Sequence, residues 1–217
     1  PASAPFLKAQ FSHFFPAILE GFVTKYQYTQ SLGDFMKIAL TSLVILLTAS
    51  TPFTVEGVAF ERTLKTPTTS LDIAGASGFT YALIFDVLSG AIYLPPGTPS
   101  AQFVQADNKA LVLSYKRDFS AEEFREVTAN LFRKNNPTSQ VKELEGSLTA
   151  FNALYQDVSE GDSYQLTLIE GIGIELKKNS KALGIIRNPQ FAKAVFNVWF
   201  GASPFDKSFR DTLLKGF

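Results

Sequence analysis

The segment from Tyr164 to Leu214 constrains the fold of this 217-residue chain more than any other part. Residues 164–169 alternate as a strand, and a glycine-containing turn leads into a hairpin that returns through residues 183–186. Asn188-Pro189 is typical of a capped helix start, and Gly201 is typical of a helix end. The segment therefore predicts neighbouring strands followed by a helix.

The residues before this segment predict further strands. Residues 58–64 alternate as a strand, and residues 71–73 begin a return strand. The run Phe79–Leu94 is apolar on both faces, so we expect one long central strand that is covered on both sides. Residues 110–117 alternate again.

Three helices are expected in addition to the one after Asn188. Ser120 and Glu123 have the spacing of a capping box, which marks the start of the first. The second has apolar side chains in a 3-4-3-4 spacing from Val141 to Tyr155, and we expect that stripe to face the core. The third should begin at Ser203-Pro204. Antiparallel strands and helices in separate blocks predict an α+β fold.

Composition limits the chemistry. Lys plus Arg (20) equals Asp plus Glu (20), so no basic excess favours nucleic acid, and we expect no nucleic-acid partner. The chain has no cysteine, which excludes disulfides, thiolate metal sites and a cysteine nucleophile. The only histidine is His13, so the main body lacks both a Ser-His-Asp triad and a histidine metal site. We expect no metal and no cofactor.

The only methionine, Met36, opens a segment with the layout of a secretory signal peptide. Lys37 supplies a basic start, residues 38–47 are an apolar run, and residues 48–50 are small. The apolar run is shorter than the about 20 residues that a membrane-spanning helix needs, so we expect no stable transmembrane anchor. The alternative is a buried helix or strand of the fold.

The chain is therefore expected to have three parts. These are a doubtful upstream extension (1–35), a signal peptide (36–50) and one domain (51–217) that works in the periplasm or is secreted. If Met36 is the true start, residues 1–35 are upstream sequence; the alternative is a genuine aromatic-rich extension.

Several ordered blocks carry a family resemblance. They are F-D-V-L-S-G-A-I-Y-L-P (85–95), L-S-Y-K-R-D-F-S-A-E-E-F-R-E (113–126), F-N-A-L-Y (151–155) and A-V-F-N-V-W-F-G-A-S-P-F-D (194–206). With these blocks the chain resembles the bacterial chalcone isomerase-like family, related to plant chalcone isomerases. The resemblance implies an open-faced β-sandwich, in which a layer of helices packs on a large antiparallel sheet.

The resemblance also implies where catalytic groups would lie. Plant chalcone isomerases stabilise a phenolate with an arginine, and threonine, tyrosine and asparagine side chains hold a water network. The matching positions here are Thr80 for the arginine, Leu88 for the threonine, Phe124 for the tyrosine, and Asn130 or Leu131 for the asparagine. Because the guanidinium and two of the hydroxyls are missing, we expect no chalcone isomerase activity.

A second branch of the same fold, plant fatty-acid-binding proteins, holds a fatty carboxylate with an arginine and a tyrosine. Many bacterial relatives carry an arginine in the corresponding glycine turn, where this chain has Gly78-Phe79-Thr80. This departure weakens a carboxylate anchor and leaves a neutral apolar ligand possible.

The candidate ligand-binding residues are polar side chains on or near the predicted strands and helices. Arg117 is either an anion anchor or a solvated strand end paired with Asp118 or Glu122, and the tyrosines either line a cleft or pack in the core. We expect Trp199 to be a core residue, and the pair Glu170 and Glu175 to lie on the surface. The candidates are Thr80, Tyr93, Tyr115, Arg117 and Asn130.

Three functional hypotheses remain. The leading one is a non-catalytic exported domain that binds a fatty acid or other small apolar molecule, in keeping with the 13% aromatic content. The alternatives are an isomerase or lyase-type enzyme of unknown substrate, and a structural or partner-binding module without a ligand. A cavity of about 300 Å³ or more between sheet and helices would argue against the last. The oligomeric state is left open.

Overall fold

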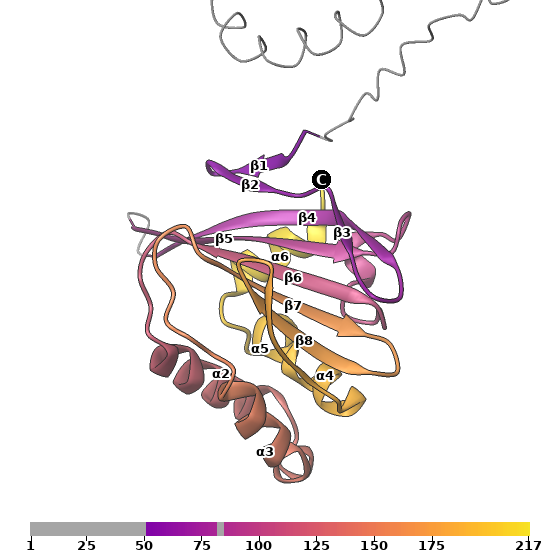
Figure 1. Ribbon diagram of the computed structural model, residues 1–217, viewed down its shortest axis with the longest axis vertical. Helices are drawn as coiled ribbons and strands as arrows, with labels where there is room; N and C mark the ends of the chain where they lie inside the picture. Colours follow the sequence, from indigo (N-terminus) through magenta and orange to yellow (C-terminus); the bar gives the residue numbers. More distant parts are fainter. Residues whose placement is uncertain (1–50, 82–84) are drawn as a thin grey trace, which may run out of the picture. The chain divides into compact units, whose positions relative to one another are not determined.

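A seven-stranded antiparallel sheet forms the centre of the fold (Figure 1). Each strand pairs with its neighbour in sequence, in the order β3-β4-β5-β6-β7-β8-β9. The strands are β3 (Thr63–Lys65), β4 (Ser70–Tyr81), β5 (Phe85–Leu94), β6 (Lys109–Tyr115), β7 (Ser163–Ile169), β8 (Gly173–Lys178) and β9 (Lys181–Ile186).

This computed structural model describes residues 51–81 and 85–217. The expected extension (1–35) and signal peptide (36–50) lie outside the described residues. Among the helices of the described ranges, none has both the length and the apolar character that crossing a membrane requires.

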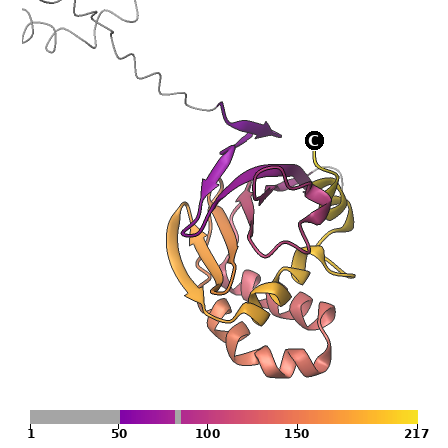
Figure 2. The same cartoon turned by 90° about the vertical axis from the view of Figure 1, so that its right-hand side faces the viewer.

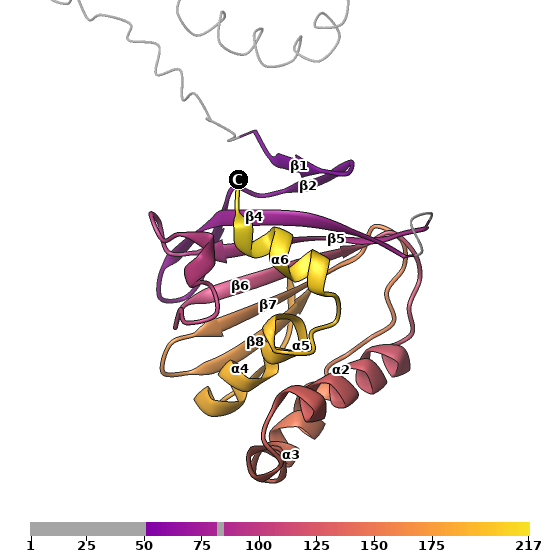
Figure 3. The same ribbon diagram turned by 180° about the vertical axis from the view of Figure 1, so that it is seen from behind.

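Helices cover one face of the sheet, as Figure 3 shows for α4, α5 and α6. The sheet curves around this helical side (Figure 2). The expected α+β fold, with a layer of helices on a large antiparallel sheet, is confirmed. The helices are η1 (Ser100–Gln102), α2 (Ala121–Asn135), α3 (Thr138–Asn152), α4 (Pro189–Val195), α5 (Asn197–Phe200) and α6 (Lys207–Lys215).

The other face of the sheet carries a short hairpin of β1 (Phe53–Val55) and β2 (Val58–Phe60). Glu56 and Gly57 form its turn, with φ angles of 46° and 80°. Beneath it lies a second, smaller apolar cluster, so β4 and β5 are covered on both faces. The buried members of that cluster are Phe60, Leu71, Ala76, Ala91, Tyr93 and Ala110.

Strand alternation assigns side chains to the two faces. On β6, Leu111, Leu113 and Tyr115 enter the main core under the helices, whereas Ala110 and Val112 belong to the cluster on the other face. This is the period of two that the sequence shows for residues 110–117.

The prediction of a single strand over Phe79–Leu94 is wrong at its start. Residues 79–81 belong to β4, and β5 begins at Phe85. Residues 82–84, between the two strands in the sequence, include no glycine, proline or asparagine as a turn signal, so the sequence does not mark where one strand ends and the next begins.

Two expected helix boundaries also differ. The helix after Asn188 is divided into α4 and α5, and Gly201 follows the second as expected. The last helix begins after Asp206, whose carboxylate accepts a hydrogen bond from the Phe209 amide at 2.7 Å, and not at Ser203-Pro204. The Ser203 amide instead donates to Asn135 Oδ1 at 2.7 Å, so it is used in a tertiary contact.

Lys109, at the start of β6, is a buried cation, only 2% exposed. Its ammonium donates to the backbone oxygens of Phe103 (3.0 Å) and Val104 (2.8 Å). It also lies 5.0 Å from the centre of the Phe196 ring. Burial is the main cause that lowers its pKa from 10.5 to about 8.

This pKa predicts how stability depends on pH. Between pH 8 and 10.5 the unfolded chain binds more protons at Lys109 than the folded chain does, so stability rises with pH in that window. From pH 7 to about 9.5 the free energy of unfolding should rise by about 2 kcal/mol from this residue. Urea titrations of the wild type and Lys109→Met at both pH values test this. An equal rise in both proteins would show that Lys109 is not its source.

Candidate functional site

A cavity of about 220 Å³ lies between the helix-covered face of the sheet and the helices α2 and α5. Strands β5, β6 and β7 supply its floor, including Leu88, Leu113 and Leu166. Trp199 of α5 and Phe205 of the following loop close another side. The wall is therefore almost entirely apolar.

Helix α2 is positioned over the sheet by its capping box. The Ser120 amide donates to Glu123 Oε2 at 2.7 Å, and the Glu123 amide donates to Ser120 Oγ at 3.3 Å. This start places Phe124 and Thr128, one turn apart, against the cavity. Val127, 44% exposed, lies on the same wall and marks its open side.

Aromatic rings pack against one another around the cavity. Phe124 is central: its ring centre lies 5.1 Å from that of Tyr115, 5.4 Å from Tyr155 and 5.2 Å from Tyr164. Rings from β6, α2, β7 and the loop after α3 therefore fix one another, which gives the wall a defined shape.

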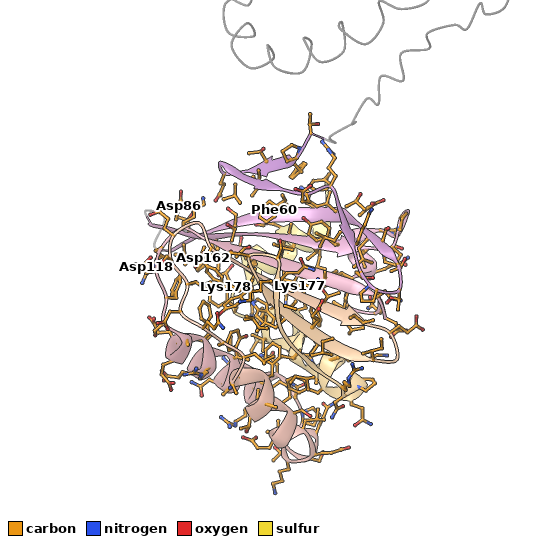
Figure 4. The ribbon with its side chains drawn as sticks, in the orientation of Figure 1. Phe60, Asp86, Asp118, Asp162, Lys177 and Lys178 are labelled. Carbon is orange, nitrogen blue, oxygen red and sulfur yellow. The ribbon has the colours of Figure 1, made fainter. Side chains whose placement is uncertain are left out.

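Ionic contacts hold the loop that brings Tyr155 from α3 to the cavity. Lys178 of β8 pairs with Asp162 at 2.9 Å and donates to the Asp157 backbone oxygen at 2.7 Å. Figure 4 shows Lys178 and Asp162 near the middle of the molecule. The Ser159 amide, followed by Asn179 and Lys178, lowers the Asp162 pKa to about 2. The carboxylate therefore stays charged, and the contact persists, at physiological pH.

The hydroxyl groups of the wall differ in their hydrogen bonds. The Tyr164 hydroxyl is fully hydrogen-bonded, since it donates to the Gln156 backbone oxygen (2.5 Å) and accepts from the Gln156 amide (2.8 Å). Tyr155 and Thr128 bond to each other at 3.0 Å. For the Tyr115 hydroxyl no hydrogen bond is seen among the described side chains of residues 51–80 and 86–217.

Burial raises the pKa of the wall tyrosines. For Tyr115 the pKa lies well above 10, first because of burial and then because of Tyr155 and Tyr164 nearby. Burial is also the first cause of the raised pKa values of Tyr155 and Tyr164. All three are therefore neutral phenols that can donate a hydrogen bond, not phenolates that could act as bases.

The charged groups of the wall are acidic. Glu123 and Glu126 line the cavity, and no lysine or arginine is among its lining residues in the described ranges. Hydrogen bonds from Ser120, backbone first and then side chain, lower the Glu123 pKa, and Arg117 contributes to a lesser extent. Glu123 is thus an anion at neutral pH.

Of the five candidate residues from the sequence, the structure brings only Tyr115 into the cavity wall. Tyr93 lies on the opposite face of the sheet, where its hydroxyl donates to the Glu61 backbone oxygen at 2.9 Å. Asn130 is exposed on α2. The Thr80 hydroxyl donates to Asp86 Oδ1 at 2.9 Å, outside the lining. Asp86, near the start of β5, is labelled in Figure 4 where the strands of the sheet end.

Arg117 lies beside the cavity and not in it. Its guanidinium carbon is 4.8 Å from the centre of the Phe119 ring, and Phe119 is a lining residue. The expected pairing with Asp118 or Glu122 does not occur: Asp118 accepts from the Glu160 amide, and Glu122 pairs with Arg125. An attractive contact with an aromatic face holds Arg117 there.

Sequence reasoning missed Thr128 and Tyr164 as cavity residues. Thr128 follows Phe124 by four positions on α2, so the helical period could have identified it. Trp199 is 8% exposed, which fits the expected core position, yet it also lines the cavity. Glu175, expected on the surface with Glu170, is 8% exposed and pairs with Lys177 on β8.

Two positions that were matched to catalytic residues of chalcone isomerases, Leu88 and Phe124, do line the cavity. Both carry apolar side chains, so the cavity offers no polar group at either place. Within the described residues no cluster of three or more His, Cys, Asp or Glu side chains could hold a metal ion.

Comparisons with known proteins agree with this architecture. A family model described as chalcone isomerase-like matches residues 52–215. A crystal structure of an Arabidopsis thaliana fatty-acid binding protein is similar, with a TM-score of 0.50 and 15% identity, over 70% of this chain and 96% of that chain. No match is found among curated proteins. The chain therefore belongs to the chalcone isomerase-like family.

Proposed function

We propose that this protein binds the apolar part of a small lipid-like molecule, such as a fatty acyl chain, and that it catalyses no reaction on it. The observation that carries this proposal is the cavity under α2, whose wall is aliphatic and aromatic, with few polar groups. Leu88 and Phe124, which the family resemblance matches to a threonine and a tyrosine of chalcone isomerases, are apolar lining residues. The similar plant structure is named as a fatty-acid binding protein, which supports the same class of ligand.

The size of the cavity limits the ligand. Its volume of about 220 Å³ does not reach the about 300 Å³ that would argue against a module without a ligand, and it is below the common range for ligand sites. We therefore propose that a short acyl chain, or the end of a longer one, enters the cavity. The rest of a longer molecule would lie at the open side beside Val127.

Trp199 is the only tryptophan of the chain, and it lines the cavity, so it reports on occupancy directly. Protein purified from its host compartment should carry a co-purified lipid in native mass spectrometry. After delipidation, medium-chain lipids should change Trp199 fluorescence in a saturable way. Failure of both measurements would refute the proposed binding.

A matched pair of variants locates the binding. Val127→Phe places a larger side chain at the open side of the cavity, and Val104→Phe makes the same change at a position 41% exposed and outside the lining. The first should weaken lipid binding at least about tenfold by filling the entrance, and the second should leave it unchanged. Equal effects of the two would place the ligand elsewhere.

The apolar side chains of Leu88 and Phe124 in the cavity wall predict no turnover of chalcones. Naringenin chalcone should cyclise at its spontaneous rate, because Leu88 and Phe124 cannot orient water or stabilise a phenolate. An absorbance assay tests this, with heat-treated protein as the control. Saturable turnover that heat removes would show that other groups supply the chemistry.

We also propose that the protein is exported, with residues 36–50 as its signal peptide and residues 51–217 as the working domain. The pattern of a basic start, an apolar run and small residues supports this. N-terminal sequencing of material from the periplasm or the medium should find a start just after residues 48–50. Material that retains residues 1–35 would contradict export by this route.

A further inference from the structure

The polar groups of the cavity suit a neutral ligand better than an anion. Its charged lining residues in the described part of the chain are the carboxylates Glu123 and Glu126. Arg125, on the same helix, is occupied by Glu122 (3.2 Å) and by two backbone oxygens, one at the end of α3 and one in the loop after it. A carboxylate that enters the cavity would therefore lose water without meeting a cation.

One wall hydroxyl stands apart from the others. Tyr164 is saturated by the backbone of Gln156, and Tyr155 and Thr128 share one hydrogen bond, whereas no hydrogen bond of the Tyr115 hydroxyl is seen among the described side chains. Tyr115 is 5% exposed and lines the cavity, so its side chain can meet a ligand there.

We propose that the cavity selects a neutral lipid with a hydrogen-bond acceptor, such as a ketone or ester carbonyl, which the Tyr115 hydroxyl binds by donating its proton. Tyr115 is then the residue that determines specificity, and fatty carboxylates are poor ligands. This inference rests on the proposed lipid binding and adds the chemistry of the polar end.

Two physical effects support this selectivity. A hydrogen bond from the Tyr115 hydroxyl to a ligand breaks no hydrogen bond seen within the described part of the protein, so an acceptor on the ligand adds a modest net gain in affinity. Conversely, an anion next to Glu123 and Glu126 is disfavoured by like charge as well as by the loss of water. Because the Tyr115 pKa is raised, its proton is present at any physiological pH.

The test compares two ten-carbon probes, 2-decanone and sodium decanoate, by Trp199 fluorescence at pH 7.5. We expect 2-decanone to bind at least about tenfold more tightly than decanoate. Tyr115→Phe should weaken 2-decanone binding about three- to tenfold, the usual range for one neutral hydrogen bond, and leave decanoate binding unchanged. Glu126→Lys should strengthen decanoate binding, because it adds a cation to the wall.

Arg117→Gln is the matched control. Arg117 lies over Phe119 outside the lining, so its removal should not change 2-decanone binding. Decanoate that binds as tightly as 2-decanone and is lost in Arg117→Gln would overturn the neutral-ligand inference while leaving lipid binding intact. If neither probe binds to the wild type or to any variant, the proposed function itself fails.

The proposed role of Tyr115 can be refuted independently of the proposed lipid binding. An unchanged affinity of Tyr115→Phe for 2-decanone would refute its hydrogen bond to the ligand. Loss of the hydroxyl should not unfold the protein, because the ring keeps its contacts with Phe124 and Tyr164. An unchanged urea midpoint verifies this, and a lowered midpoint would show that the hydroxyl has a structural partner, which contradicts the inference.

Discussion

Replacing Phe191 with alanine should lower the free energy of unfolding by about 3–5 kcal/mol. Phe191 lies in the first turn of α4 and is fully buried. Its ring centre lies 5.6 Å from those of Phe132 on α2 and Phe151 on α3, so one side chain joins three helices. The loss is a large share of the about 5–15 kcal/mol that stabilises a typical domain. Urea denaturation followed by circular dichroism measures it.

Phe217→Ala is the matched control, because it removes the same atoms from a side chain that is 71% exposed. Its ring meets only Phe53 among the aromatic contacts of the described residues, at 4.3 Å between centres. It should cost less than about 1 kcal/mol. Similar losses in the two variants would mean that the helical layer does not depend on Phe191.

The second large effect is expected at Gly173, the first residue of β8. Its φ of 144° is a conformation that side chains disfavour, and an added Cβ would collide with the Ile186 backbone oxygen of β9. Gly173→Ala should therefore destabilise the protein by about 2–5 kcal/mol through backbone strain and crowding. The same denaturation experiment measures this loss.

Gly146→Ala makes the same chemical change where neither restriction applies. Gly146 lies within α3, and nothing lies within 4 Å of the position of an added Cβ. This variant should be stabilised by about 0.5–1 kcal/mol, because alanine favours the helix. If both glycine variants lose stability equally, the register of β8 against β9 is not what requires Gly173.

These effects concern the scaffold around the cavity. Phe191, Phe132 and Phe151 join three helices to one another and lie outside the cavity lining. Leu88 and Phe124 line the cavity, and they also belong to the main apolar core or pack against it. A fold of this kind can carry different functions through the side chains of one site.

The sequence alone determined the elements whose signals are local. The capping box at Ser120 and Glu123 and the Asn188 cap of α4 need only a few neighbouring residues, and both form as expected. The alternation of residues 110–117 likewise assigned Leu113 and Tyr115 to one face of a strand. The family blocks then implied the sheet and helix layer.

Only the tertiary structure decided which faces and boundaries matter. Tyr93 and Tyr115 are both strand tyrosines, but Tyr93 lies under the β1–β2 hairpin and Tyr115 faces the cavity. Alternation separates the two faces of a strand, but it does not say which face the helices cover and which face the hairpin covers. Likewise Ser203-Pro204 has a local helix-start pattern, yet Asn135 of α2 binds the Ser203 amide and the cap moves to Asp206. The hydrogen bonds of the wall hydroxyls were also decided by the tertiary structure. Thr128 on α2 and Tyr155 in the loop after α3 bond to each other and not to Tyr115, and packing between distant segments sets this pairing.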